Sequence, residues 1–157
     1  MIANLSELKW CLLSSVALML QCLLYGIPVM SQRKKHFTPE FLTPIHPEKT
    51  PAKLGYPDTG SGRYSKQLTL SAWIEFMKMM RAHLNFVECL PVFVFLILSL
   101  GVFDPLTAGI CGFSLVVLRL FHLAAYWIHP NLRIVGSLPT NLVLGYMTFS
   151  LATQFLK

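Results

Sequence analysis

The stretch LSAWIEFMKMMRAHLNFVECLPVFVFLILSL, residues 70–100, decides the fold of this chain. A helix that crosses a bilayer needs about 20 mostly apolar residues, each adding about 1.5 Å. This stretch is longer than that and contains no glycine. We therefore predict one helix that spans a membrane and extends beyond it at one end.

The composition of the whole chain agrees with that prediction. The chain has 157 residues, 54% of them hydrophobic, and only 13% are charged. Its mean hydropathy is +0.56. A soluble domain of this size would carry about 25% charged residues. The composition therefore excludes an ordinary soluble domain and indicates an integral membrane protein.

Three other apolar segments have the length of a membrane span. We expect transmembrane helices over residues 8–29, 70–100, 106–128 and 135–155, with a loop over residues 31–69 that is ordered only in part. Pro28, which follows Gly26, is expected at the frayed end of the first helix. Residues 101–105 are expected to form a tight turn. The predicted fold is a single all-α domain, a four-helix transmembrane bundle.

The charge distribution predicts the orientation of this bundle. Seven of the thirteen Lys and Arg residues lie between Met30 and Leu70, in the predicted loop. Such a loop is typically cytoplasmic, which places both termini of a four-span chain on the non-cytoplasmic side. We expect an endoplasmic-reticulum-like endomembrane or a bacterial inner membrane. No nucleic-acid partner is expected, because no aromatic or glycine-rich binding module accompanies the basic residues.

The cysteines suggest neither a disulfide scaffold nor a metal site. All four lie in apolar stretches, and none forms a C-x-x-C pair: Cys11, Cys22, Cys89 and Cys111. We expect them to act as small buried hydrophobic side chains.

Two lines of polar residues cross the apolar segments. Residues three or four apart lie on one face of a helix. The first line has spacings of 3, 3, 4 and 3 and comprises Glu75, Lys78, Arg81, Asn85 and Glu88. The second has spacings of 3, 4 and 3 and comprises Arg119, His122, Tyr126 and His129. A charge inside a bilayer costs roughly 2.5–3.5 kcal/mol, so it persists mainly where it is paired or binds something.

Two explanations of these lines remain open at this point. In the first, Glu88 neutralises Arg119 and Asn85 bridges two helices, which is an ordinary way to hold a bundle together. The second starts from the surplus of donors over the one deep carboxylate. That surplus suits a bound molecule with carboxylates, which arginine side chains bind well. The donors are Arg81, Arg119, His122, Tyr126 and Arg133.

Four motifs in order resemble the MAPEG family, the membrane-associated proteins in eicosanoid and glutathione metabolism. The motifs are RKKHFTPE at residues 33–40, RAHLNFVECLP at 81–91, Arg119-x-x-His122-x-x-x-Tyr126, and NLRIVG at 131–136. The resemblance covers nearly the whole chain. It implies a homotrimer whose active sites lie at subunit interfaces and bind glutathione from the cytoplasmic side.

The resemblance also implies a role for each candidate residue. The glutathione-binding residues would be Arg81, Asn85, Glu88, Arg119, His122 and Tyr126. Arg133 would be catalytic and would stabilise the glutathione thiolate, the form of a thiol that acts as nucleophile. A lipophilic substrate would approach from the membrane lipid along an apolar wall. We expect that wall to comprise Leu84, Phe86, Val87, Leu142 and Phe149.

The implied function is a glutathione-dependent transferase or peroxidase for hydrophobic electrophiles or lipid hydroperoxides. Leu84 and Ile134 depart from prostaglandin E synthase, so the chain is closer to bacterial and leukotriene-synthase-type members. One alternative is a non-catalytic lipid-presenting membrane protein of the same fold. Another, which the polar lines alone would allow, is a small proton-coupled transporter that uses Glu88 and His122.

Overall fold

The computed structural model describes residues 6–45 and 58–156, and the chain is helical throughout these ranges apart from short connections. Four helices are long and apolar enough to cross a membrane. The predicted four-helix transmembrane bundle is therefore confirmed. The elements are α1 (Lys9–Leu24), α2 (Gly26–His36), α3 (Pro39–Leu42), the 3₁₀ turn η1 (Ser65–Gln67), α4 (Leu70–Gly101), α5 (Pro105–Ile128), the 3₁₀ turn η2 (Pro130–Arg133) and α6 (Ile134–Phe155).

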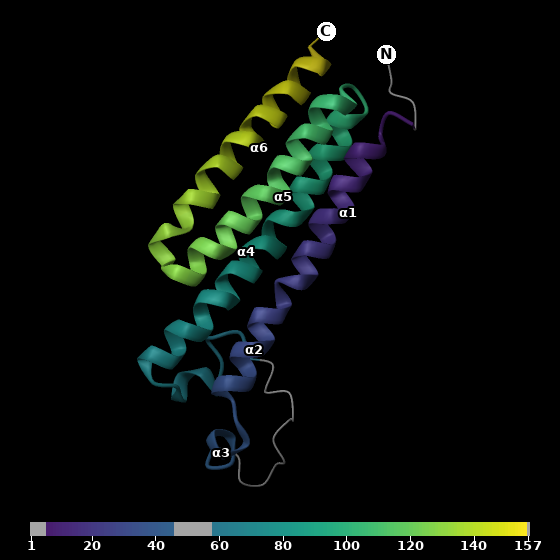
Figure 1. Ribbon diagram of the computed structural model, residues 1–157. Helices are drawn as coiled ribbons and strands as arrows, with labels where there is room; N and C mark the ends of the chain where they lie inside the picture. Colours follow the sequence, from purple (N-terminus) through teal and green to yellow (C-terminus); the bar gives the residue numbers. More distant parts are fainter. Residues whose placement is uncertain (1–5, 46–57, 157) are drawn as a thin grey trace.

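Helices α4 and α5 form the centre of the bundle, because each contacts α1 and α6 as well as the other. The start of α1 and the end of α6 lie at the same end of the bundle, and α2 and α4 extend past α5 and α6 at the opposite end (Figure 1). At 32 residues, α4 is about 48 Å long, whereas the hydrocarbon core is about 30 Å thick. This extension beyond the bilayer was predicted from residues 70–100.

The first helix is longer than predicted. It continues past the expected end at residue 29 to His36, with only a turn at Tyr25 between α1 and α2. The prediction was wrong because it treated Pro28 as a helix breaker. Proline lies here in the first turn of α2, where backbone N–H groups have no partner within the helix, so its missing N–H costs nothing.

Small residues allow α1 to approach α4 and α5 closely. A Cβ atom added to Gly101 would lie 2.8 Å from Cys11 Sγ, and one added to Gly109 would lie 2.9 Å from Trp10 Cβ. Such small residues are common at helix contacts in membranes, where packing rather than the hydrophobic effect holds helices together. All four cysteines are free, and Cys89 alone is not fully buried, which agrees with their predicted role as small hydrophobic side chains.

The turn between α4 and α5 is the tight turn predicted for residues 101–105. Asp104 is the N-cap of α5, and its carboxylate accepts a hydrogen bond of 3.1 Å from the Thr107 N–H. Pro105 is the first residue of the helix, a position that proline favours.

One carboxylate organises the part of the loop between residue 58 and α4. Asp58 accepts hydrogen bonds from the backbone N–H groups of Gly60, Gly62, Tyr64 and Ser65 and from the Ser65 hydroxyl. Burial alone would raise the pKa of Asp58, but these donors hold it below its ordinary value of 3.8. This segment is therefore an ordered cap.

Two further hydrogen bonds attach that cap to the helices. Arg33 Nη2 on α2 donates to the Asp58 carbonyl at 3.0 Å, and the Trp73 indole on α4 donates to the Gly60 carbonyl at 2.8 Å. Gly60 has a φ of +102°, and a Cβ atom there would collide with Met77. The cap thus joins α2 to α4 beyond the bundle.

We predict that Asp58→Ala detaches this cap, because several backbone N–H groups lose their acceptor at a cost of about 2 kcal/mol. Limited trypsin digestion at Arg63 and Lys66 should then be at least several times faster than in the wild type, while Glu40→Ala, which removes an exposed carboxylate, should change nothing. A folded-state pKa below the ordinary value contributes stability above that value, and the contribution is lost as pH falls through the lowered pKa. In the wild type, the contribution of the Asp58 carboxylate to the stability of the cap should therefore persist down to pH 3.8. Equal digestion of Asp58→Ala and wild type would contradict the role of this carboxylate.

Candidate functional site

Arg119 on α5 is a charged side chain enclosed within the bundle. Only 1% of its surface is exposed. Its Nη1 and Nη2 atoms both donate to the Asn85 Oδ1 atom on α4, at 3.1 Å each. Asn85 therefore bridges two helices, as one sequence-based explanation predicted.

The other half of that explanation is wrong. Arg119 forms no ion pair with Glu88; on α4 it is Glu75 that forms ion pairs, with Lys35 and His36. The guanidinium is instead stabilised by the faces of two aromatic rings. Its Cζ atom lies 4.6 Å from the centroid of Phe86 and 5.8 Å from that of Phe93. Such cation–π contacts gain strength where water is absent.

Phe86 is therefore not part of an apolar wall that faces lipid, which corrects the prediction. It is fully buried under the Arg119 guanidinium and packs edge-on against Tyr25, with the ring centroids 4.9 Å apart. Val87, Leu142 and Phe149 are exposed, and Leu84 is half-buried. The expected wall thus keeps three fully outward-facing members.

The hydrogen bonds to Asn85 decide what this residue can offer to a ligand. Because both Nη atoms of the Arg119 guanidinium donate to Oδ1, the orientation of the amide is fixed, and its NH₂ group has no hydrogen bond to the described residues. Asn85 is half-buried, one turn from the exposed carboxylate of Glu88. The same face of α4 thus offers a hydrogen-bond donor next to a hydrogen-bond acceptor.

His122 and Tyr126 continue the line from Arg119 along α5, and both are buried. Their ring centroids lie 5.1 Å apart. Within the described residues, neither imidazole nitrogen of His122 forms a hydrogen bond of good geometry. These two rings therefore lie inside the subunit, unlike the first polar line, whose members Arg81 and Glu88 are exposed on α4.

The start of α6 lies directly against His122. A Cβ atom added to Gly136 would come within 2.5 Å of the His122 Cα atom, so only glycine permits this approach. Arg133, at the end of η2, immediately precedes α6 and is exposed. The contact at Gly136 therefore fixes the position from which the Arg133 guanidinium extends.

The seven predicted site residues thus fall into two groups. Arg119, His122 and Tyr126 are buried within one chain, and Asn85 connects them to the surface. The side chains of Arg81, Glu88 and Arg133 are exposed and form no hydrogen bond or ion pair with the described residues. Sequence reasoning missed two residues that support the site: Gly136 and Tyr25, whose hydroxyl donates to the Arg119 carbonyl. Their only sequence signals are a glycine in the first turn of α6 and a phenol in an apolar run.

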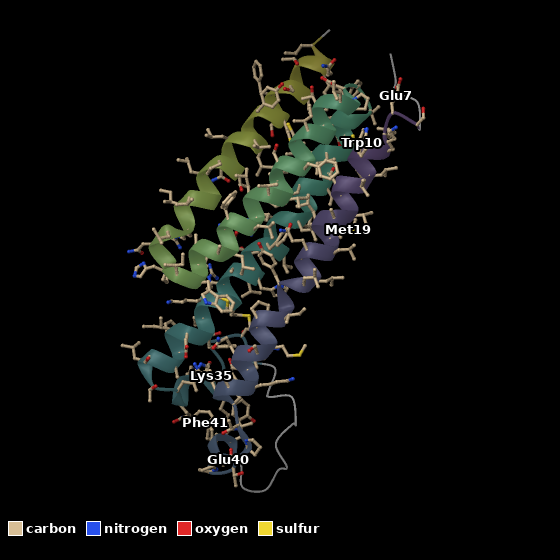
Figure 2. The ribbon with its side chains drawn as sticks, viewed as in Figure 1. Glu7, Trp10, Met19, Lys35, Glu40 and Phe41 are labelled. Carbon is tan, nitrogen blue, oxygen red and sulfur yellow. The ribbon has the colours of Figure 1, made fainter. Side chains whose placement is uncertain are left out.

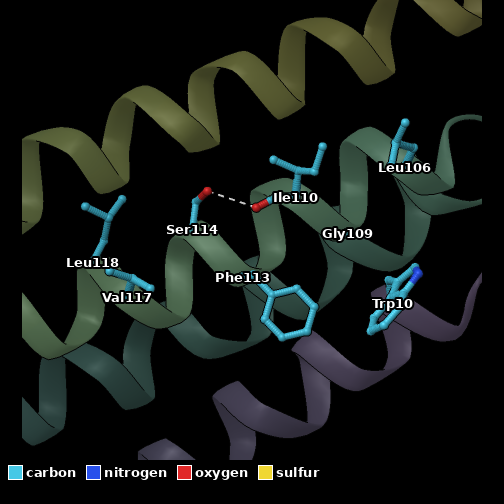
Figure 3. Close-up of a pocket in the computed structure, with 8 residues that line it drawn as sticks. All are labelled: Trp10, Leu106, Gly109, Ile110, Phe113, Ser114, Val117 and Leu118. Atoms are coloured by element: carbon cyan, nitrogen blue, oxygen red, sulfur yellow. Dashed lines mark hydrogen bonds between the residues drawn. The ribbon is translucent and has the colours of Figure 1, made fainter.

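One hollow lies away from these residues, between the start of α1 and α5. It has a volume of about 760 Å³ and is bordered by Trp10 on α1 and a face of α5 that includes Phe113 and Val117 (Figure 3). Its one hydroxyl, that of Ser114, donates to the carbonyl of Ile110 at 2.9 Å. The rest of the lining is apolar apart from the indole N–H of Trp10, so this hollow does not resemble a site for a polar ligand.

Comparison with known proteins gives one positive result. The sequence model of the MAPEG family matches residues 11–153, which is nearly the whole chain. A search of curated proteins finds no match.

We predict that Asn85→Leu destabilises the protein by about 3 kcal/mol, because it leaves a buried guanidinium without an acceptor. The double variant Asn85→Leu/Arg119→Met should recover part of that loss, because it also removes the charge. The measurement is thermal unfolding in detergent. Asn141→Leu, the same change at an exposed position of α6, serves as the control. A double variant no more stable than Asn85→Leu would contradict this account.

We also predict that Gly136→Ala destabilises the contact between α5 and α6, whereas Gly145→Ala does not. A Cβ atom at Gly145 meets nothing within 4 Å, so alanine there should be neutral or slightly stabilising through its better helix propensity. The difference in unfolding midpoint between the two variants measures the close approach directly. Equal midpoints would show that the helices do not meet at Gly136.

Proposed function

Because this chain belongs to the MAPEG family, we propose that it is a glutathione-dependent transferase or peroxidase. Its substrates would be hydrophobic electrophiles or lipid hydroperoxides dissolved in the membrane. The observation that carries the proposal is the outward face of α4, where the fixed amide of Asn85 lies one turn from the unpaired carboxylate of Glu88.

That face complements glutathione, a tripeptide with two carboxylates, one amine and one thiol. Glu88 would accept hydrogen bonds from the amine, and the free NH₂ group of Asn85 would donate to a carbonyl or carboxylate oxygen. Arg81, one turn from Asn85 and exposed, would bind a carboxylate with its guanidinium. In the described part of the chain, the side chains of Glu88 and Arg81 form no other hydrogen bond or ion pair. Asn85 forms only the two hydrogen bonds from Arg119 that orient its amide.

Arg119 has a different role from the one implied by resemblance alone. It is almost completely enclosed, and its donors point at Asn85. We infer that Arg119 acts on glutathione through Asn85 by holding the amide with its NH₂ group outward. His122 and Tyr126 would support that arrangement from the same face of α5.

Arg133 would activate the thiol. A free thiol has a pKa of about 8.5, so little thiolate exists at neutral pH unless a cation stabilises it. Arg133 is exposed at the N-terminal end of α6, where the helix dipole adds partial positive charge. The thiolate would then attack an electrophilic carbon and displace a leaving group. With a hydroperoxide it would instead attack the terminal oxygen and break the O–O bond, the alkoxide would take a proton from water to become the alcohol, and a second glutathione would reduce the resulting sulfenic acid to the disulfide and water.

The exposure of Glu88 also supports a homotrimer. An isolated carboxylate facing lipid would cost roughly 2.5–3.5 kcal/mol. Helix α6 likewise leaves most of its apolar surface outside the subunit. Neighbouring copies would cover both faces and create sites at the interfaces. Val87, Leu142 and Phe149 would offer the lipophilic substrate an apolar approach, and both chain ends would lie on the non-cytoplasmic side.

We predict that the purified protein in detergent binds glutathione and produces the ultraviolet absorbance band of a thiolate. Arg133→Ala should lower the band at neutral pH by several fold while leaving calorimetric binding largely intact. Arg63→Ala, which removes an exposed arginine from the loop, should leave both unchanged. Glu88→Gln should instead weaken binding itself, because the amine of glutathione loses its ion pair.

Two outcomes would overturn the proposal. The absence of calorimetric binding at millimolar glutathione would reject the enzyme and favour a lipid-presenting protein of the same fold. Binding without a thiolate band, in wild type and Arg133→Ala alike, would reject the catalytic role of Arg133 and leave the binding residues in place. Flux of a solute across sealed vesicles, abolished by Glu88→Gln, would favour a transporter.

A further inference from the structure

Lys78 belongs to the first polar line but takes no part in the proposed glutathione site. It lies on α4, one turn before Arg81, at the level where α5 ends. Its Nζ atom donates to the carbonyl of Ile128, the last residue of α5, over a long distance of 3.4 Å. An ammonium has three donors, so at least two remain free beside this contact.

Lys78 lines one shallow hollow and contacts the edge of a second through Ile128. One runs along α4 and is lined by Leu70, Ser71, Ile74, Glu75 and Lys78, with a volume of about 580 Å³. The other, of about 390 Å³, lies on α5 and is almost wholly apolar. The lining of this second hollow includes Ile128, whose carbonyl accepts the hydrogen bond from Lys78. The ammonium group of Lys78 therefore lies between a partly polar hollow and an apolar hollow.

The one acidic side chain in this region does not repel an anion. Glu75 is neutralised by Lys35, whose Nζ lies 2.8 Å from the carboxylate, and it accepts from His36 Nε2 at 3.1 Å. Lys35 lies near the end of the bundle opposite the chain termini (Figure 2). The region thus has a surplus of positive charge at the basic end of a membrane protein.

An aromatic side chain marks the same level. Trp127 lines the apolar hollow on α5 and is 60% exposed. Tryptophan collects at the boundary between hydrocarbon and headgroups. The cation, the partly polar hollow and the apolar hollow at that boundary correspond to the phosphate, the headgroup and an acyl chain of a phospholipid.

We propose that Lys78 and the two adjoining hollows form a binding site for one anionic phospholipid. Lys78 binds the phosphate, the headgroup lies along Ser71 in the hollow on α4, and an acyl chain lies against Leu120, Ala124 and Trp127 on α5. The anionic leaflet that faces a basic loop supplies this lipid, and each basic side chain near it contributes about 1 kcal/mol of attraction. The site is separate from that proposed for glutathione.

The experiment is native mass spectrometry of the purified protein after exchange into mixed micelles. The micelles contain phosphatidylglycerol and phosphatidylcholine with identical acyl chains. We expect the wild type to retain phosphatidylglycerol in preference to phosphatidylcholine. Lys78→Gln should lower the retained phosphatidylglycerol about five-fold and leave phosphatidylcholine unchanged. Lys66→Gln, the same loss of charge at an exposed position in η1, should behave as the wild type.

A second variant tests the acyl-chain part of the site while Lys78 stays in place. Ala124→Trp fills the hollow on α5 and should lower retention of phosphatidylglycerol by a similar factor. Equal retention of the two lipids by the wild type, or unchanged selectivity in Lys78→Gln, would overturn the proposal. Dissociation of the oligomer without a change in lipid selectivity would also overturn it and identify the surface as a subunit contact. Glutathione binding by Lys78→Gln should be unchanged, so failure of the lipid site and failure of the proposed function can be told apart.

Discussion

The buried guanidinium of Arg119 is the constraint on which the rest of the bundle depends. A charge in this position is tolerated because Asn85 accepts from both Nη atoms and the rings of Phe86 and Phe93 lie against the guanidinium. Three of these contacts come from α4 and the charge itself comes from α5. The electrostatic requirement of one residue therefore fixes how two helices face each other.

That fixed relation decides which groups reach the surface. Phe86 is buried toward α5 and Asn85 lies at the edge of that contact, so Glu88 and Arg81, which lie on the other side of Asn85 from Phe86, are exposed on α4. In a single chain, these charged side chains would face lipid, which is energetically unfavourable. In a site between two chains, the same exposure would let them contact a ligand. The same geometry that stabilises Arg119 thus leaves Glu88 available to a ligand.

The sequence predicted the membrane class, the four spans and the turn at residues 101–105, because these depend on local composition and on capping chemistry. It did not predict which polar line is buried.

Helical spacing shows that Arg119, His122 and Tyr126 share one face of a helix, but it does not show which helix covers that face. The cover depends on the close approach of α6 at Gly136. Phe86 was misplaced for a similar reason, since an aromatic ring suits both lipid and the underside of a guanidinium. Asp58 was missed because its five donors lie within seven residues of it in a loop, where no periodic pattern exists.

The two arginines closest to the proposed chemistry show why burial separates structural from catalytic charge. Arg119 has its Nη donors bound by Asn85, so it cannot follow a change in the charge of a ligand. Arg133 has no such partner and lies at the start of α6, where a developing thiolate would meet both its guanidinium and the helix N-terminus. An arginine that is to stabilise a newly formed thiolate must have no ion-pair partner before the thiolate forms, because such a partner would first have to be displaced. This is the physical reason to assign positioning to the enclosed arginine and thiol activation to the exposed one.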